Sequence, residues 1–215
     1  MKRRKRKLNL LVTAGPTCEP IDPVRFISNY STGFFGYEIA REAGRRGHRV
    51  ILISGPTRLA KPPGVRSIDV FTARQMGEEL QDKFSWCDCL IMTAAVCDFR
   101  PERVAKKKIK RKEGGIALNL KQNPDILGGL GRKKDKKMLV GFALETEDLK
   151  KNAQDKLRRK NLDLIVATQM KADERPFGQV RIDALIMDRK ARIEKIKRAT
   201  KKRLSGILLD RIEKM

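Results

Sequence analysis

The segment of residues 13–36 most constrains what this chain can fold into. It follows an apolar run at residues 8–12 that predicts a first strand, and it ends at Gly33 and Gly36, where an amphipathic helix begins. It is rich in Gly, Pro, Ser, Thr and Asn, which indicates a loop with a defined conformation rather than a flexible one. Backbone N–H groups and the helix dipole converge at such a junction, so we expect an anion to bind there.

Strand-like and helical segments alternate along the rest of the chain, which predicts an α/β fold. Further strands are expected at residues 49–54, 67–71, 89–95, 138–142 and 163–167, and a late hairpin at 184–187 and 191–196. Further helices are expected at residues 72–86, from Pro124, from Glu145 and after Thr200. We therefore expect a Rossmann-like, mainly parallel sheet flanked by helices. In such sheets ligands bind beyond the carboxyl ends of the strands, so the loops after Val12, Ala95 and Phe142 should share one rim.

Length and charge pattern predict a basic tail at residues 1–7 and a single domain over residues 8–215, with a projecting basic arm or flap at about residues 104–120. No apolar run approaches the roughly 20 residues that span a bilayer. The N-terminus has no apolar segment or cleavage site typical of a secretory signal. We expect a cytoplasmic protein.

The chain has 4 cysteines and 1 histidine. Cys87 and Cys89 are separated by one residue, whereas zinc ribbons use two or more, so we expect reduced thiols in the core or lining a site rather than a metal cluster. His48 lies in a turn and is expected to be a surface residue without a functional role.

The formal net charge of +24 leaves three classes open: a nucleic-acid binder, an enzyme with phosphorylated ligands, or a protein with an exceptionally basic surface. Aromatic residues make up only 5% and do not alternate with the basic runs, which weakens the case for base stacking. A nicotinamide cofactor is disfavoured because the first loop is too long, and the second strand ends in Ser54 and Gly55 without an acidic residue.

Six ordered motifs carry a family resemblance: residues 13–36, 94–101 (AAVCDFRP), 108–110 (KIK), 123–126 (NPDI), 141–146 (GFALET) and 160–167 (KNLDLIVA). From Leu8 to the final helix the chain closely resembles phosphopantothenoylcysteine synthetase, the CTP-dependent ligase of bacterial coenzyme A biosynthesis. The family joins 4′-phosphopantothenate to L-cysteine through a phosphopantothenoyl-cytidylate and converts CTP to CMP and pyrophosphate. The resemblance implies Mg²⁺ with CTP as co-substrate, no flavin, and a homodimer whose flap is exchanged across the interface.

In many bacteria this domain is fused to a flavin-dependent phosphopantothenoylcysteine decarboxylase. The chain has no room for that half, so we expect a free-standing synthetase, with the decarboxylase as a possible separate partner and with no membrane association. The choice between CTP and ATP as the nucleotide stays open, although the pattern of motifs is similar to that of the CTP-using group.

The resemblance assigns catalytic roles to Asn29, which would hold the acyl-cytidylate, and to Lys108, a flap lysine that would help to form it. The alternatives are a turn asparagine and a solvated run of charge. The implied nucleotide-binding residues are Gly15, Met92, Thr93, Ala94, Asp98, Lys108, Pro124, Asp125, Ile126, Leu127, Phe142, Lys156 and Lys160. The implied substrate-binding residues are Asn29, Ser31, Arg25 and Ala95, and no protein ligand to a metal is assigned.

Lys156 and Lys160 are one helical turn apart, so both ammonium groups could contact one polyphosphate, although surface pairing with Glu is the alternative. Two departures from the family pattern lie in the first loop, where Cys18 and Phe34 stand at positions that are often basic. Either other cations such as Arg25 compensate, or the affinity for substrate is weaker. The alternative function is a basic nucleic-acid-binding protein on a Rossmann-like scaffold.

Overall fold

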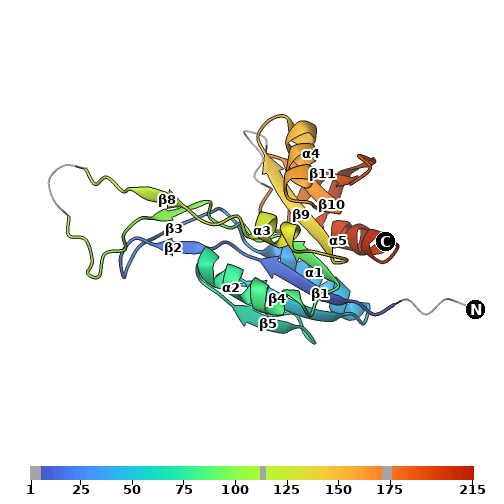
Figure 1. The fold of residues 1–215 in the computed structure, drawn as a ribbon, viewed down its shortest axis with the longest axis horizontal. Coiled ribbons are helices and arrows are strands. Elements are labelled where there is room, and N and C mark those ends of the chain that lie inside the picture. The colour runs from blue at the N-terminus through green and yellow to red at the C-terminus, as the bar shows by residue number, and fades with distance from the viewer. Residues whose placement is uncertain (1–5, 112–114, 171–175) are drawn as a thin grey trace, which may run out of the picture.

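A computed structural model describes residues 6–111, 115–170 and 176–215. Its centre is an eight-stranded sheet in the order β12-β11-β10-β9-β6-β1-β4-β5 (Figure 1). These strands are β1 (Asn9–Ala14), β4 (Arg49–Ser54), β5 (Arg66–Asp69), β6 (Cys89–Met92), β9 (Met138–Glu145), β10 (Leu164–Gln169), β11 (Arg181–Asp188) and β12 (Ile193–Thr200). Pairing is parallel from β5 to β10, and β11 is antiparallel to both of its neighbours. The mainly parallel sheet and the late hairpin are confirmed.

Both faces of the sheet are buried, which is why its strands have nearly continuous apolar sequences. In β1 the side chains of Leu10 and Val12 join one core with helices α1 (Phe34–Arg45) and α5 (Lys201–Ile212). Leu11 points to the other face, into a second core under helices α2 (Ala73–Phe84), α3 (Ile126–Arg132) and α4 (Leu149–Arg159). The result is a three-layer sandwich of helices, sheet and helices.

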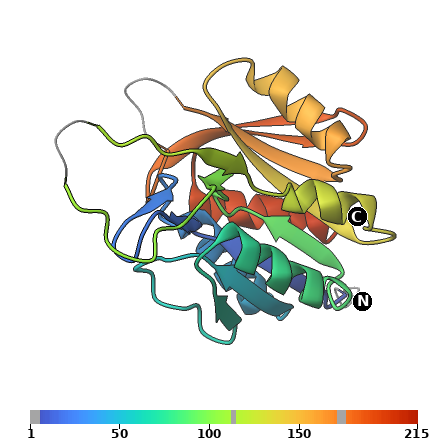
Figure 2. The same cartoon turned by 60° about the vertical axis from the view of Figure 1, so that its left-hand side comes forward.

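Two small ribbons extend from one end of this body (Figures 1 and 2). One pairs β2 (Cys18–Pro20) with β3 (Phe26–Ser28) inside the first loop, and the other pairs β7 (Phe99–Pro101) with β8 (Leu120–Gln122). The described residues between β7 and β8, 102–111 and 115–119, project as the expected arm (Figure 1), and the backbone N–H of Ala105 donates to the carbonyl of Ile21 at 2.9 Å. The arm therefore lies along the ribbon of the first loop.

Asp22 joins the ribbon of the first loop to the arm between β7 and β8. Its buried carboxylate accepts hydrogen bonds from the backbone N–H groups of Val24 and Ile109, at 2.9 and 3.1 Å, and pairs with the guanidinium of Arg25. The bonds from Arg25 and from these amides outweigh desolvation and hold the pKa of Asp22 well below its usual range. This carboxylate therefore links the first loop to the arm as an anion.

Several expected boundaries were wrong. β6 ends at Met92 rather than residue 95, because Ala95 leaves the sheet to bridge Pro16 in the first loop. α3 begins at Ile126 after an Asp125 cap, so Pro124 precedes the helix, and α4 begins only at Leu149 because β9 runs on to Glu145.

The expectation for His48 was also wrong, because its side chain is buried. Nδ1 accepts from the backbone N–H of Leu8 at 3.2 Å, and Nε2 lies 3.1 Å from Oε1 of Glu213. The histidine connects the start of β1 to the end of the chain, which local turn propensity does not reveal.

Candidate active site

A pocket of about 1100 Å³ opens at the carboxyl ends of β1, β6 and β9. Among the parallel strands the order from β5 to β10 reverses direction at β1 and β6, and this switch point is where ligands of such sheets bind. The pocket is lined by the loop before α1, by the loop after β6, by residues 122–127 and by parts of β9, α4 and β10. The expectation that the loops after Val12 and Ala95 share one rim is confirmed, but the expected third loop, after Phe142, is not a loop, because β9 continues to Glu145 and its residues 141–144 line the pocket from within the strand.

Backbone hydrogen bonds between the loop after β1 and the loop after β6 form the floor of the pocket. The backbone N–H of Ala95 donates to the carbonyl of Gly15 at 2.9 Å, and the N–H of Thr17 donates to the carbonyl of Ala95 at 3.2 Å. Gly15 adopts a φ of 72°, and a Cβ there would lie 2.9 Å from the carbonyl oxygen of Gly55. The crossing therefore requires glycine at this position.

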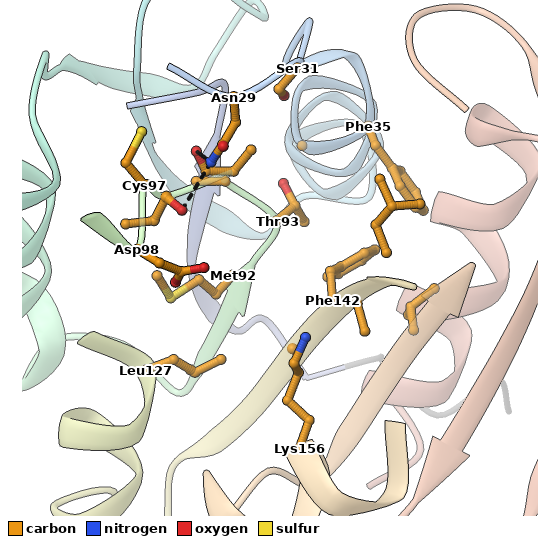
Figure 3. A pocket seen from close by; sticks show the side chains of 18 of the residues that line it. Asn29, Ser31, Phe35, Met92, Thr93, Cys97, Asp98, Leu127, Phe142 and Lys156 are labelled. Carbon is orange, nitrogen blue, oxygen red and sulfur yellow. Dashed lines mark hydrogen bonds between the residues drawn. The ribbon is translucent and has the colours of Figure 1, made fainter. Parts of the chain in front are cut away.

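Asn29 lies over this crossing (Figure 3). Its Nδ2 donates to the carbonyls of Ala95 and Val96, at 3.2 and 3.1 Å. Both amide donors thus face the protein's own backbone, so Oδ1 is the atom of Asn29 that remains to meet a ligand. Ser31 follows on the same loop and lines the same pocket.

The opposite side of the pocket contains most of the residues expected to bind a nucleotide. Figure 3 shows Leu127 and Lys156 across the pocket from Asn29 and Ser31, with Met92 and Asp98 between them. The remaining expected nucleotide residues that line this pocket are Thr93, Ala94, Pro124, Asp125, Ile126, Phe142 and Lys160.

An aromatic pair forms one wall. The ring of Phe35, on α1, stands edge-on to that of Phe142, on β9, with 5.0 Å between centroids. Phe34 at the start of α1 also lines the pocket, so this helix presents apolar rings to it.

Lys156 of α4 and Lys160, which caps the C-terminus of this helix, both line the pocket, and each already has a carboxylate partner. Lys156 Nζ lies 3.0 Å from Glu145, and Lys160 Nζ lies 2.9 Å from Asp125. Burial favours the neutral form of Asp125, but bonds from Lys160 and from the N–H of Gly128 outweigh it and lower the pKa of this carboxyl. The acidic partners lie on β9 and at the start of α3 rather than on the lysines' own helix.

Three of the expected site residues lie outside the pocket lining. Gly15 shapes the floor from below, and Arg25 is paired with Asp22 and also donates to the carbonyl of Ile109 at 3.1 Å. Lys108 is exposed on the arm. Arg25 therefore binds Asp22 and the arm rather than lining the pocket, and its expected role as a substitute cation stays a prediction.

Sequence reasoning missed the C-terminal contribution to the pocket. Pro176, Phe177 and Lys201 line it, as does Arg159, the residue before Lys160. The one signal in the sequence was a lysine directly after the Thr200 cap, where a helix N-terminus disfavours a cation.

All four cysteines are buried free thiols, as expected, and Cys97 lines the pocket. Burial raises the pKa of Cys97, which makes it a poor nucleophile. Among residues 6–111, 115–170 and 176–215 there is no group of three or more His, Cys, Asp or Glu side chains that could hold a metal ion. Over the same residues, none of the helices is long and apolar enough to cross a bilayer.

Comparison with known proteins identifies a matching family and several similar proteins. The family model described as DNA/pantothenate metabolism flavoprotein C-terminal domain matches residues 5–215. The chain is 49% identical over 171 residues to the coenzyme A biosynthesis bifunctional protein CoaBC of Bacillus subtilis, covering 79% of this chain and 42% of that protein. It is 42% identical over 205 residues to a cysteine/cysteine sulfinic acid decarboxylase of an unknown prokaryotic organism, covering 94% and 57%.

A solved structure is also similar. The crystal structure of the C-terminal domain of a CoaBC protein superimposes with a TM-score of 0.84 and 37% identity, covering 97% of this chain and 95% of that one. The curated relatives are longer proteins, since the chain spans 42% of the first and 57% of the second.

Proposed function

The chain belongs to the family of DNA/pantothenate metabolism flavoprotein C-terminal domains, and from this premise we propose that it is a cytoplasmic ligase of coenzyme A biosynthesis. It joins 4′-phosphopantothenate to L-cysteine and uses CTP. The observation that carries the proposal is that Asn29 and Ser31 lie across one pocket from Lys156, with Met92 and Asp98 between them. The flavin belongs to the decarboxylase part of the longer relatives, not to this domain.

The proposed reaction has two steps. The carboxylate of 4′-phosphopantothenate attacks the α-phosphate of CTP, which breaks the bond to the β-phosphate and releases pyrophosphate. The amine of cysteine then attacks the acyl carbon of the mixed anhydride, loses a proton and expels CMP. Both steps move negative charge onto phosphate oxygens, so nearby cations lower both barriers.

The geometry supports a division of labour within the pocket. Cytidine would pack near Met92 and Leu127, where apolar side chains and the end of β6 allow close approach. The triphosphate would extend toward Lys156 and Lys160, and in doing so it would compete with Glu145 and Asp125 for their ammonium groups. The phosphates would therefore displace the carboxylate partners of these lysines rather than bind unpaired ammonium groups.

Asn29 would hold the acyl end of the intermediate. With both amide donors on backbone carbonyls, its Oδ1 would accept from an amide or amine N–H of the bound species. A neutral acceptor orients the group without adding negative charge beside the phosphates.

Mg²⁺ would arrive with the triphosphate. Magnesium is commonly held by one or two carboxylates together with substrate phosphates, and Asp98 is a carboxylate that lines the pocket. When bound, the ion would neutralise phosphate charge, while Lys156 and Lys160 would orient the same groups.

Lys108 would act from the arm. Its exposed position, together with the apolar side chains Val104, Ile116 and Leu118 exposed on the same arm, supports a homodimer in which the arm reaches a neighbouring pocket. A separate phosphopantothenoylcysteine decarboxylase would consume the product.

The decisive experiment measures pyrophosphate release by the purified protein from CTP or ATP, with and without 4′-phosphopantothenate and cysteine. Release that requires 4′-phosphopantothenate and prefers CTP supports the proposal, and the absence of substrate-dependent release refutes it. Carbon dioxide release from cysteine should be followed in parallel, because one relative is named a decarboxylase.

The net charge of +24 favours nucleic-acid binding as a second candidate function. A steep fall in RNA or DNA affinity with rising salt, equivalent to several released counterions, would support it. Salt-insensitive or undetectable binding at low salt would remove it.

A further inference from the structure

Lys201 is a buried lysine whose ammonium is held by backbone carbonyls. Its side chain lies at the first position of α5, the residue is only 6% exposed, and Nζ donates to the carbonyls of Pro176 and Gly178 at 2.6 and 2.8 Å. The other buried lysine of the described residues, Lys134, has a carboxylate partner in Asp163 at 2.7 Å. Lys201 therefore differs in having neutral acceptors rather than a counterion.

This arrangement is costly for a cation. The first turn of a helix carries partial positive charge, and burial lowers the pKa of Lys201 to about 8. An apolar side chain would avoid that cost but would leave two carbonyls without their donor. The benefit of the lysine thus lies in what it does to residues 176–178.

Pro176 and Phe177 form a wall of the pocket, and together with Gly178 they contact the loop that carries Asn29. The ring of Phe177 lies 6.2 Å from that of Tyr30, and the backbone N–H of Gly178 donates to Oγ1 of Thr32 at 3.2 Å. All four segments, the loop at 29–32, Pro176, Phe177 and Lys201, line the same pocket. Through residues 176–178, Lys201 therefore connects α5 to the loop at 29–32, on the side of the pocket that contains Asn29. Among the described residues it makes no such connection to the opposite side, where Leu127 and Lys156 lie.

We propose that Lys201 is a positioning residue that fixes residues 176–178 against the loop at 29–32 and so sets the affinity of the pocket for the acyl substrate, 4′-phosphopantothenate. The substrate assignment rests on the proposed function. The positioning role itself is a property of the unliganded protein.

The test compares Lys201→Met, which keeps the length of the side chain and removes its donors, with Lys201→Arg, which keeps a donor cation. Lys202→Met, the exposed neighbour on the same helix, is the matched control. Steady-state kinetics should show KM for 4′-phosphopantothenate raised about tenfold in Lys201→Met, with KM for CTP changed by less than about twofold. Lys201→Arg should recover part of the loss, and Lys202→Met should match the wild type.

Hydrogen exchange of the unliganded proteins provides the readout that needs no activity. Peptides spanning residues 176–182 should exchange at least about tenfold faster in Lys201→Met than in the wild type or Lys202→Met. If Lys201→Met does not fold, Lys201→Arg carries the comparison with a smaller expected increase in exchange, because the longer guanidinium keeps donors but changes the geometry of both short bonds.

The outcomes separate the two claims. Unchanged exchange at residues 176–182 overturns the positioning role, and an equal rise in KM for CTP and 4′-phosphopantothenate overturns the assignment to the acyl side. A wild-type protein that neither releases pyrophosphate nor binds 4′-phosphopantothenate in calorimetry overturns the proposed function and the substrate assignment with it, while the exchange result still decides the positioning role.

Discussion

The amide of Asn29 donates to the carbonyl of Ala95 at 3.2 Å, so a side chain of the first loop closes over the crossing of two strand ends. Ala95 is itself bound to Gly15 and Thr17 through its backbone, which makes this carbonyl a fixed acceptor. The orientation of Asn29 is therefore set before any ligand binds, and preorganisation of this kind is what a catalytic amide needs.

Asn29→Ala should separate the two proposed steps. With enzyme in excess over CTP, so that a single turnover is followed, the rate of pyrophosphate release should stay within about threefold of the wild type, while the rate of cysteine-dependent product formation should fall about 100-fold or more, because the intermediate loses the group that orients it. Parallel assays of pyrophosphate and of phosphopantothenoylcysteine measure the two. Gln81→Ala, an exposed amide on α2, serves as control, and an equal loss of both products would contradict this role.

Asn29→Asp tests the direction of the hydrogen bonds. A carboxylate cannot donate to the carbonyls of Ala95 and Val96, so its side chain should turn away and product formation should fall as in Asn29→Ala. Activity close to that of the wild type would show that only the acceptor oxygen matters.

Lys108→Ala should block the first step. The side chain is exposed, so stability should not change, but pyrophosphate release should fall about 100-fold if this ammonium stabilises charge on the transferring phosphate. Lys110→Ala, two residues away and equally exposed on the arm, is the matched control. Similar losses in both variants would mean that the arm contributes only diffuse positive charge.

The mainly parallel sheet and its flanking helices could be predicted from sequence because each depends on a local pattern: apolar runs of strand length, and caps such as Thr72 and Thr200, both of which accept the expected backbone bond. The order of the strands within the sheet was not predicted, because it depends on pairing between distant segments. The β2–β3 ribbon could not, because its three-residue strands are held by long-range contacts, such as the bond from the N–H of Cys18 to the carbonyl of Phe71. His48 was misjudged for the same reason, since its partners come from both ends of the chain.

The pocket was predictable in part. The residues on the ends of parallel strands follow from topology, and the lining confirms their convergence. Phe177 precedes the C-terminal hairpin and Lys201 follows it at the start of α5, and the approach of both to the first loop depends on tertiary packing alone. The carboxylate partners of Lys156 and Lys160 likewise lie 11 and 35 residues away in sequence, beyond any helical spacing rule.

Lys160→Met should weaken nucleotide binding specifically. Loss of the ammonium should raise KM for CTP about tenfold, and KM for 4′-phosphopantothenate should change by less than about twofold. Lys151→Met, exposed on the same helix and outside the pocket lining, is the matched control. A uniform rise in both KM values would indicate a general electrostatic effect instead.

Glu42→Gln should alter acid stability. Hydrogen bonds from Arg45 and then Arg46 lower the pKa of Glu42 from 4.5 to about 2, against the opposing effect of burial. Because the folded-state pKa is the lower one, this carboxylate stabilises the fold above about pH 4.5, and the contribution is lost as the pH falls through about 2.

Urea unfolding should therefore show Glu42→Gln less stable than the wild type by about 1–2 kcal/mol at pH 7, after allowance for solvent screening, with the difference shrinking toward pH 2. Glu78→Gln on α2, whose pair with Arg74 is long at 3.9 Å and exposed, should change stability little at either pH. A pH-independent difference would mean that Glu42 acts through packing rather than charge.

Gly36→Ala tests how tightly α1 packs on the strand ends beneath the pocket. A Cβ at Gly36 would lie 2.5 Å from Oγ1 of Thr93, 2.6 Å from Cβ of Ala14 and 2.7 Å from the carbonyl oxygen of Thr13, so the helix must move away from β1. We expect a loss of about 2–3 kcal/mol in the free energy of unfolding, even though alanine favours helices.

Gly44→Ala in the same helix is the control, since its nearest neighbour would be a methyl group of Val65 at 3.3 Å, which can yield. Its stability should stay within about 1 kcal/mol of the wild type, because the gain in helix propensity offsets the crowding. Displacement of α1 by the Gly36 substitution would also shift Phe35 against Phe142, so KM for CTP should rise in Gly36→Ala and not in Gly44→Ala. Equal free energies of unfolding for the two variants would show that α1 can move away from β1 without loss of stability. The pocket wall would then not depend on the absence of a side chain at position 36.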